Sequence, residues 1–129
     1  MPIKRPSLRL LLLAAFMPVA AQSAAPAPQA RATIVLSSHR FSPAPIYLAG
    51  GVPVRLMLTN RSAQDHEFVA PDFFRGARLI RGRVVDGEVK VASGKTLFLD
   101  VVPRRGTYKV HCGRFGHELL GMSTMIIVT

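Results

Sequence analysis

Turn residues interrupt this 129-residue sequence at short intervals after residue 30, and they leave room only for short extended segments. Typical turn signals stand at 49–51, 86–87 and 93–94. The segments between them alternate or are rich in β-branched residues; in 53–59, Val54, Leu56 and Leu58 fall on one face. No stretch keeps the period of a long helix. The sequence therefore predicts an all-β protein, an antiparallel sandwich or barrel.

The expected strands differ in the place that each can take in a sheet. Residues 41–48 include Pro43 and Pro45, which suit a short edge strand because proline donates no hydrogen bond to a strand ladder. Residues 71–82 show no clear period and are expected to be loop, a short helical turn, or both. Residues 84–91 are expected to form two strand pieces around a turn. The other expected strands are 32–37, 53–59, 96–102, 107–112 and 123–129.

The N-terminal residues have the pattern of a secretion signal. Lys4, Arg5 and Arg9 form a positive region, residues 10–16 a short apolar core, and residues 19–21 a small-residue cleavage site. The apolar core is shorter than the roughly 20 residues of a membrane helix, so we expect a soluble exported protein with no membrane span after cleavage. We expect it in the periplasm if the host has two membranes. The expected boundaries are 1–25 for the signal peptide and start of the linker, 26–30 for a Pro/Ala linker, and 31–129 for the folded domain.

Charge and cysteine content narrow the classes of function. Removal of the leader takes away three basic residues and no acidic ones, so the formal charge of +10 falls by three, to +7. Export makes nucleic acid an unexpected partner; the positive charge fits an acidic protein surface, anionic headgroups, or solubility alone. The single cysteine excludes an intramolecular disulfide framework and Cys-rich zinc or iron–sulfur sites.

The run from Tyr108 to Met122 joins two expected strands and carries the most specific chemistry. Cys112, His117 and Met122 are spaced Cys-x4-His-x4-Met. Thiolate and thioether are soft donors and imidazole is borderline, a set that suits copper and not calcium, magnesium or manganese. A further imidazole must come from elsewhere in the chain. His66 is the natural candidate, because it begins a strand after a polar loop.

Ordinary structural explanations exist for several of these residues. Cys112 could be a buried thiol and Met122 could fill the core, because both side chains pack readily. His111 neighbours Cys112 in a strand, so its side chain is expected on the opposite face. His39 follows the first strand and is expected on the surface. Met125 lies three residues beyond Met122 and is expected in the core.

The sequence resembles the cupredoxins, the small blue-copper proteins, at His66, Cys112, His117 and Met122, with a loop spacing similar to the rusticyanin and stellacyanin types. The resemblance implies a Greek-key β-sandwich or barrel of about seven to eight strands. It also implies one type 1 copper per chain, held by two imidazoles and a thiolate with methionine as a long axial ligand. Glu67 departs from the pattern, because many of these proteins follow the first histidine with asparagine. Its backbone N–H is still expected to reach the Cys112 sulfur.

The resemblance implies a periplasmic one-electron carrier. We expect no enzyme and no catalytic residue, since the motif fills the strong positions of a single copper site. Two alternatives stay open: copper handling or tolerance, through buffering or delivery, and an accessory module of a periplasmic metal-uptake system. Phe115, Leu119 and Leu120 flank His117 in the sequence, and we expect them to form an apolar patch on which a redox protein docks. We expect the chain to be a monomer.

Overall fold

A computed structural model of the chain describes residues 2, 20–24, 28, 30–117 and 119–129. The predicted signal peptide and linker lie mostly outside these residues, so their boundaries stay predictions. Among the described residues, no helix combines the length and the apolar character needed to cross a membrane.

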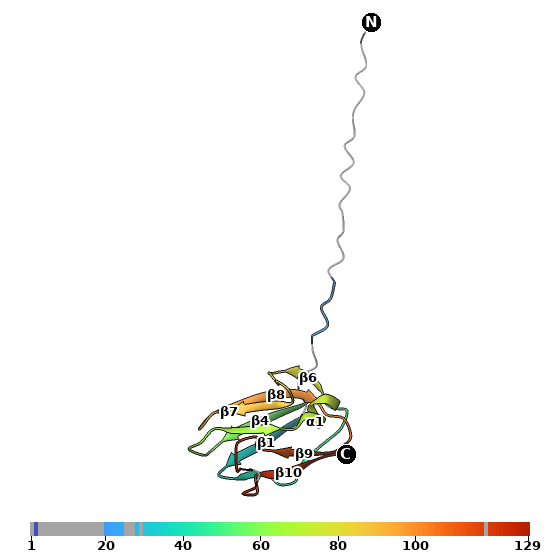
Figure 1. Cartoon of the computed structure of the whole chain (residues 1–129). Helices are drawn as coiled ribbons and strands as arrows, with labels where there is room; N and C mark the ends of the chain where they lie inside the picture. Colours follow the sequence, from blue (N-terminus) through green and yellow to red (C-terminus); the bar gives the residue numbers. More distant parts are fainter. Residues whose placement is uncertain (1, 3–19, 25–27, 29, 118) are drawn as a thin grey trace.

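Two five-stranded sheets enclose a common apolar core (Figure 1). The first sheet has the strand order β2-β1-β4-β8-β6, and the second has the order β3-β10-β9-β5-β7. The first-sheet strands are β1 (Ala30–Ser37), β2 (Arg40–Ser42), β4 (Val54–Asn60), β6 (Arg78–Arg81) and β8 (Thr96–Val102). The second-sheet strands are β3 (Ile46–Leu48), β5 (His66–Val69), β7 (Glu88–Val91), β9 (Gly106–His111) and β10 (Ser123–Val128). Most neighbours are antiparallel, whereas β1 pairs with β4, and β3 with β10, in parallel.

The all-β sandwich expected from the sequence is confirmed, but the described residues form ten strands in place of about seven to eight. The difference lies in short strands: β2 and β3 have three residues each, and β6 has four. The segment 41–48 is also not one edge strand, because β2 ends one sheet and β3 ends the other. Pro43 and Pro45 lie between them, where the missing N–H groups prevent a continuous strand.

The segment 71–82 contains both a helical turn and a strand. Helix α1 (Pro71–Gly76) begins with proline at a position where a missing N–H is tolerated, and β6 follows it. Phe73 of α1 is buried and packs against Tyr108 of β9, with ring centroids 5.6 Å apart. In 84–91 only the second expected strand piece forms, as β7; the first is reduced to a single bridge between Val85 and Glu88.

Alternation along the strands decides which side chains enter the core. Leu56 and Leu58 of β4 are fully buried, and so is Phe68 of β5, directly under the end of the second sheet that holds His66. The expectation that Met125 lies in the core is wrong: it is 37% exposed, while Ile126 beside it is buried. Successive strand residues point to opposite faces, and the even-numbered residues of β10 occupy the inner one.

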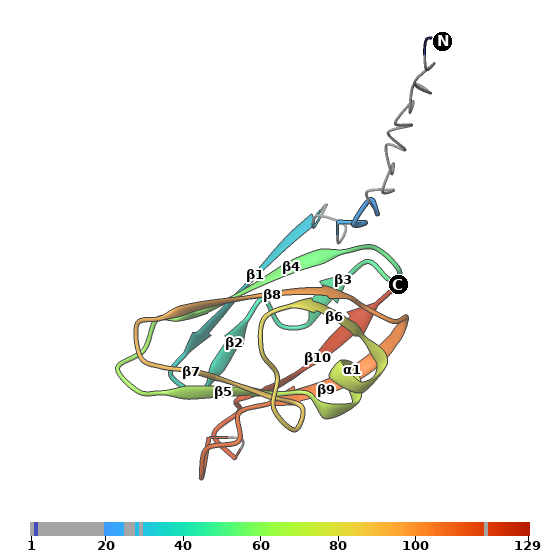
Figure 2. The same ribbon diagram turned by 90° about the horizontal axis from the view of Figure 1, so that it is seen from above.

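Three neighbouring strands of the second sheet bring the predicted ligand segments together. His66 is the first residue of β5, and Cys112 directly follows β9. Val69 pairs with His111, so continuing this register places Cys112 opposite Phe68. The loop from Cys112 to β10, orange to red in Figure 2, projects from this end of the sandwich.

Candidate metal centre

Three of the four predicted ligands meet in one buried group. The donor atoms of His66, Cys112 and His117 all lie within 4.8 Å of one another. The Cys112 Sγ atom is 3.8 Å from Nδ1 of His66 and 3.5 Å from Nδ1 of His117. His66 and Cys112 are buried, and His117 is only 8% exposed. The sequence prediction that these residues gather at one site agrees with this placement.

Backbone hydrogen bonds close the ligand loop and fix where Met122 leaves it. The Cys112 N–H donates to the Met122 carbonyl at 3.0 Å, and the Met122 N–H donates to the His117 carbonyl at 3.0 Å. The Met122 side chain is fully buried. Its backbone is thus tied to two members of the donor group, and its role as the axial ligand stays a prediction.

A hydrogen-bonded loop between β4 and β5 delivers His66 to the site. The buried Asn60 side chain donates to the carbonyls of Gln64, at 2.7 Å, and Val91, at 2.9 Å. Its Oδ1 atom accepts from both the backbone N–H and the hydroxyl of Ser62. The Asp65 carboxylate, beside His66, accepts from the Ser93 N–H at 2.9 Å. The sequence prediction did not include this support; the available signal was an asparagine at the end of an expected strand, directly before a polar loop.

Glu67 contacts the site through both its backbone and its side chain. Its N–H donates toward the Cys112 sulfur at 3.4 Å, as expected from the sequence. Such a hydrogen bond stabilises the charged form of the sulfur. The Glu67 carboxylate lies where a Cβ atom on Gly113 would stand, and Val69 closes the same space. Glycine at position 113 therefore lets the glutamate fold over the start of the ligand loop.

Burial lowers the pKa of both histidines in the group. Loss of hydration is the main cause for His66, and the nearby charges of His117 and Arg114 act in the same direction on its pKa. Desolvation is also the main cause of the lowered pKa of His117, followed by the charges of His39 and Arg114. Glu67 acts on the pKa of His117 in the opposite direction. Both imidazoles are therefore neutral at neutral pH and keep the lone pair that a metal ion binds.

The donor set and its surroundings fit a copper ion. Two neutral imidazoles and one thiol offer borderline and soft donors at a buried position. The Nε2 atom of His66 is buried without a hydrogen-bond partner in the described part of the chain. With a metal on Nδ1, the neutral ring carries its proton on Nε2, and an unpaired N–H there costs much less than a buried imidazolium would. His66, Cys112 and His117 would hold the ion, with Met122 as the predicted weak ligand.

His39 is the neighbour of the site that the sequence did not reveal. It was expected on the surface, but it is half-buried, and its ring meets that of His117 edge to face with centroids 4.9 Å apart. His39 does not belong to the donor group within 4.8 Å. His111 also lies outside that group, as expected from its place in the strand.

The loop residues around His117 form an exposed apolar surface. Phe115 and Leu119 are almost completely exposed, and Leu120 is largely exposed. We call these three residues the apolar rim. Large apolar side chains gathered beside a buried donor group are typical of an interaction surface.

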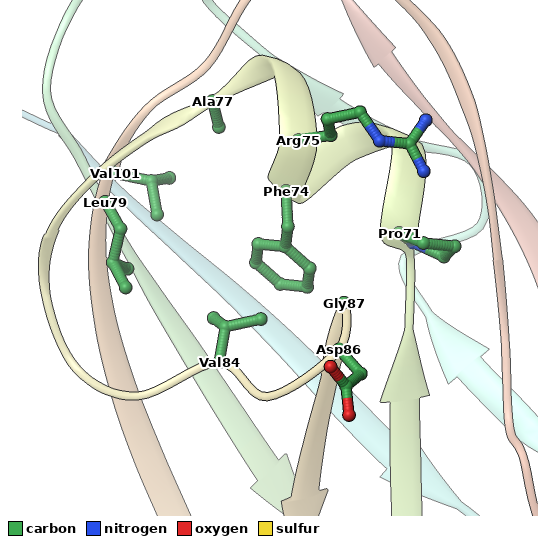
Figure 3. Close-up of a pocket in the computed structure, with 9 residues that line it drawn as sticks. All are labelled: Pro71, Phe74, Arg75, Ala77, Leu79, Val84, Asp86, Gly87 and Val101. Atoms are coloured by element: carbon green, nitrogen blue, oxygen red, sulfur yellow. The ribbon is translucent and has the colours of Figure 1, made fainter.

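A separate pocket lies between α1 and the turn at 84–87 (Figure 3). It has a volume of about 490 Å³, and Phe74, Leu79 and Val84 form much of its wall. Neither histidine, cysteine nor methionine lines this pocket. The metal-type donors thus lie elsewhere, at the end of the second sheet.

Comparisons with known proteins agree with this geometry. A family model described as a cupredoxin-like domain matches residues 9–128, and the chain belongs to this family. The cupredoxin resemblance expected from the sequence is confirmed. No curated protein matches the chain.

Solved structures share the fold at low sequence identity. Auracyanin B superposes with a TM-score of 0.62 at 16% identity, over 84% of this chain and 95% of that one. A reduced auracyanin from Roseiflexus castenholzii gives 0.60 at 15% identity, over 81% and 99%. A multicopper oxidase from Campylobacter jejuni, a metallo-oxidase, gives 0.63 at 17% identity over 83% of this chain, which spans 31% of the oxidase. At these identities the likeness shows the fold alone.

The Asn60 network predicts a measurable stability loss. Asn60→Ala removes four hydrogen bonds, among them a donor to the buried Val91 carbonyl, so we expect the apoprotein to lose about 2–4 kcal/mol of unfolding free energy in urea. Gln64→Ala keeps the network, because Gln64 takes part through its backbone, and should cost less than about 0.5 kcal/mol. Equal losses in the two variants would contradict the assignment.

The lowered histidine pKa values predict a pH dependence of apoprotein stability. The pKa of a histidine in the unfolded chain is near 6.5, while the pKa values of His66 and His117 are lower in the folded chain. As the pH falls, the unfolded chain therefore binds more protons than the folded chain. The urea midpoint should therefore decrease as the pH drops below 6.5. The double variant His66→Asn/His117→Asn should flatten this dependence, and His111→Asn should retain it. A wild-type midpoint that rises toward acid pH would contradict the prediction.

Proposed function

We propose that this chain is an exported one-electron carrier that uses a single type 1 copper ion. The observation that carries the proposal is the buried group of His66, Cys112 and His117 at one end of a cupredoxin-like sandwich. The N-terminal secretion pattern supports a periplasmic location. We expect the carrier to act as a monomer.

A bound copper ion would supply the one-electron couple. The chain's own residues hold the donor atoms in place, exclude water and place a hydrogen bond near the sulfur. His66 and Cys112 are attached to neighbouring strands, so their donor atoms have little freedom to move when the charge of the site changes. Burial of all three donors excludes water from the ligand positions. The Glu67 N–H near the sulfur adjusts how strongly the thiolate donates.

The apolar rim supports a route by which electrons leave. His117 is nearly buried, yet Phe115, Leu119 and Leu120 on the same loop are exposed. A partner seated on these side chains would approach His117 closely while excluding water from the contact. Arg114 in the same loop is exposed and favours an acidic partner surface.

Copper titration tests the proposal. Cu(II) added to the apoprotein should give an intense thiolate charge-transfer band that saturates at one ion per chain and shows reversible one-electron voltammetry. Cys112→Ser should abolish the band. Met122→Leu should shift the reduction potential, whereas the control Met125→Leu, an exposed methionine, should not. Colourless Cu(II) binding, or Cu(I) binding without reversible voltammetry, would instead indicate copper buffering or delivery.

Lysine in the apolar rim should slow electron transfer without altering the site. Leu119→Lys and Leu120→Lys add charge where two copies must meet, so we expect electron self-exchange, measured by NMR line broadening of mixed oxidation states, to slow about tenfold. The control Val85→Lys places the same charge on an exposed residue of a remote turn. A changed copper spectrum in the rim variants, or equal slowing in the control, would contradict this docking surface.

A further inference from the structure

His39 has a backbone conformation that is unusual for a residue with a side chain. It lies in the tight turn between β1 and β2, where Ser37 pairs with Arg40, and its φ is 59°. This left-handed region favours glycine, because a side chain there is strained. Residues held in such a conformation cluster at functional sites. Asp86, with φ 52°, is the other such non-glycine residue in the described part of the chain.

The His39 ring reaches across to the copper-site loop. It meets His117 edge to face, with ring centroids 4.9 Å apart and an interplanar angle of 81°. His117 in turn lies 5.1 Å from His66, between ring centroids. Edge-to-face contact between aromatic rings is attractive and depends on orientation. The His117 ring is thus in contact with one imidazole of the donor group and one from outside it.

The turn that carries His39 is fixed relative to the ligand strands. Phe41, two residues on, is buried and packs against Phe68, two residues after His66, with centroids 5.8 Å apart. The Arg61 N–H donates to the Leu36 carbonyl at 2.8 Å, which joins the end of β1 to the loop that delivers His66. The turn that carries His39 is therefore anchored to that end of the fold.

The segment that carries His117 does not by itself fix the orientation of the His117 ring. His117 lies on the loop between β9 and β10, flanked by Gly116 and Gly121 at φ 78° and 92° and by the exposed apolar rim. Loop hydrogen bonds, such as that from the His117 N–H to the Arg114 carbonyl at 3.2 Å, fix its backbone. Contacts from other segments must then set the orientation of its ring.

We propose that His39 is a positioning residue that braces the His117 ring from outside, so that its Nδ1 atom stays directed at Cys112. The proposal rests on the copper site proposed above. His39 acts by packing and not as a ligand, consistent with its place outside the donor group. It also helps to cover His117, which is only 8% exposed although its loop neighbours are exposed.

Glycine substitution separates a structural role from a positioning role. His39→Gly removes the ring and relieves the strained φ, so the apoprotein should keep its unfolding free energy in urea. Copper should nevertheless leave about tenfold faster or more, measured as decay of the thiolate charge-transfer band in excess chelator, because the brace on His117 is lost. The EPR signal of Cu(II) should change with it. His39→Phe restores a ring and should return the rate to within about threefold of wild type.

Asp86→Gly is the matched control, since it makes the same backbone change in an exposed turn away from the donor group. Its copper loss should stay within about twofold of wild type. Copper loss from His39→Gly at the wild-type rate, or equally fast loss from Asp86→Gly, would overturn the inference. A His39→Phe variant as labile as His39→Gly would overturn the packing mechanism. Failure of the wild type to develop the band would overturn the proposed function as well.

Discussion

Burial of two imidazoles and one thiol within 4.8 Å of one another is the constraint on which the rest of this structure depends. Each group is dehydrated, and burial lowers the pKa of His66 and His117, so the site keeps both imidazoles neutral. Crowded, dehydrated polar groups are unfavourable unless the fold holds them or a ligand satisfies them. A soft metal ion bound between them would satisfy the three donor atoms at once.

The two sheets divide the task of holding this group. The second sheet supplies the proposed ligands, from the start of β5 and from the segments that leave β9 and enter β10. The first sheet supplies the supports. Asn60, the last residue of β4, reaches across to the Val91 carbonyl in the second sheet, and the β1–β2 turn places His39 against His117. Neither sheet would position the site alone.

The sequence was sufficient for the parts of the site that depend on local spacing. Cys112, His117 and Met122 lie in one loop, and turn signals around alternating segments predict the sandwich. His66 followed from its polar loop and from the family resemblance. His39 could not be predicted, because its contact with His117 spans 78 positions and depends on how two sheets pack. The division of 41–48 between two sheets and the outward face of Met125 likewise depend on which strand each segment joins.

The family and the fold define a cupredoxin-like domain. The proposal that this domain carries electrons depends on the rigidity of its site. X-ray absorption at the copper edge, on the copper-loaded chain in both oxidation states, tests that rigidity most directly. The account predicts the same two nitrogen neighbours and one sulfur neighbour before and after reduction, with little change in their distances. A different number of neighbours in the reduced state would contradict it, because donors held by strand ends and, at His117, by packing against the other sheet could not rearrange.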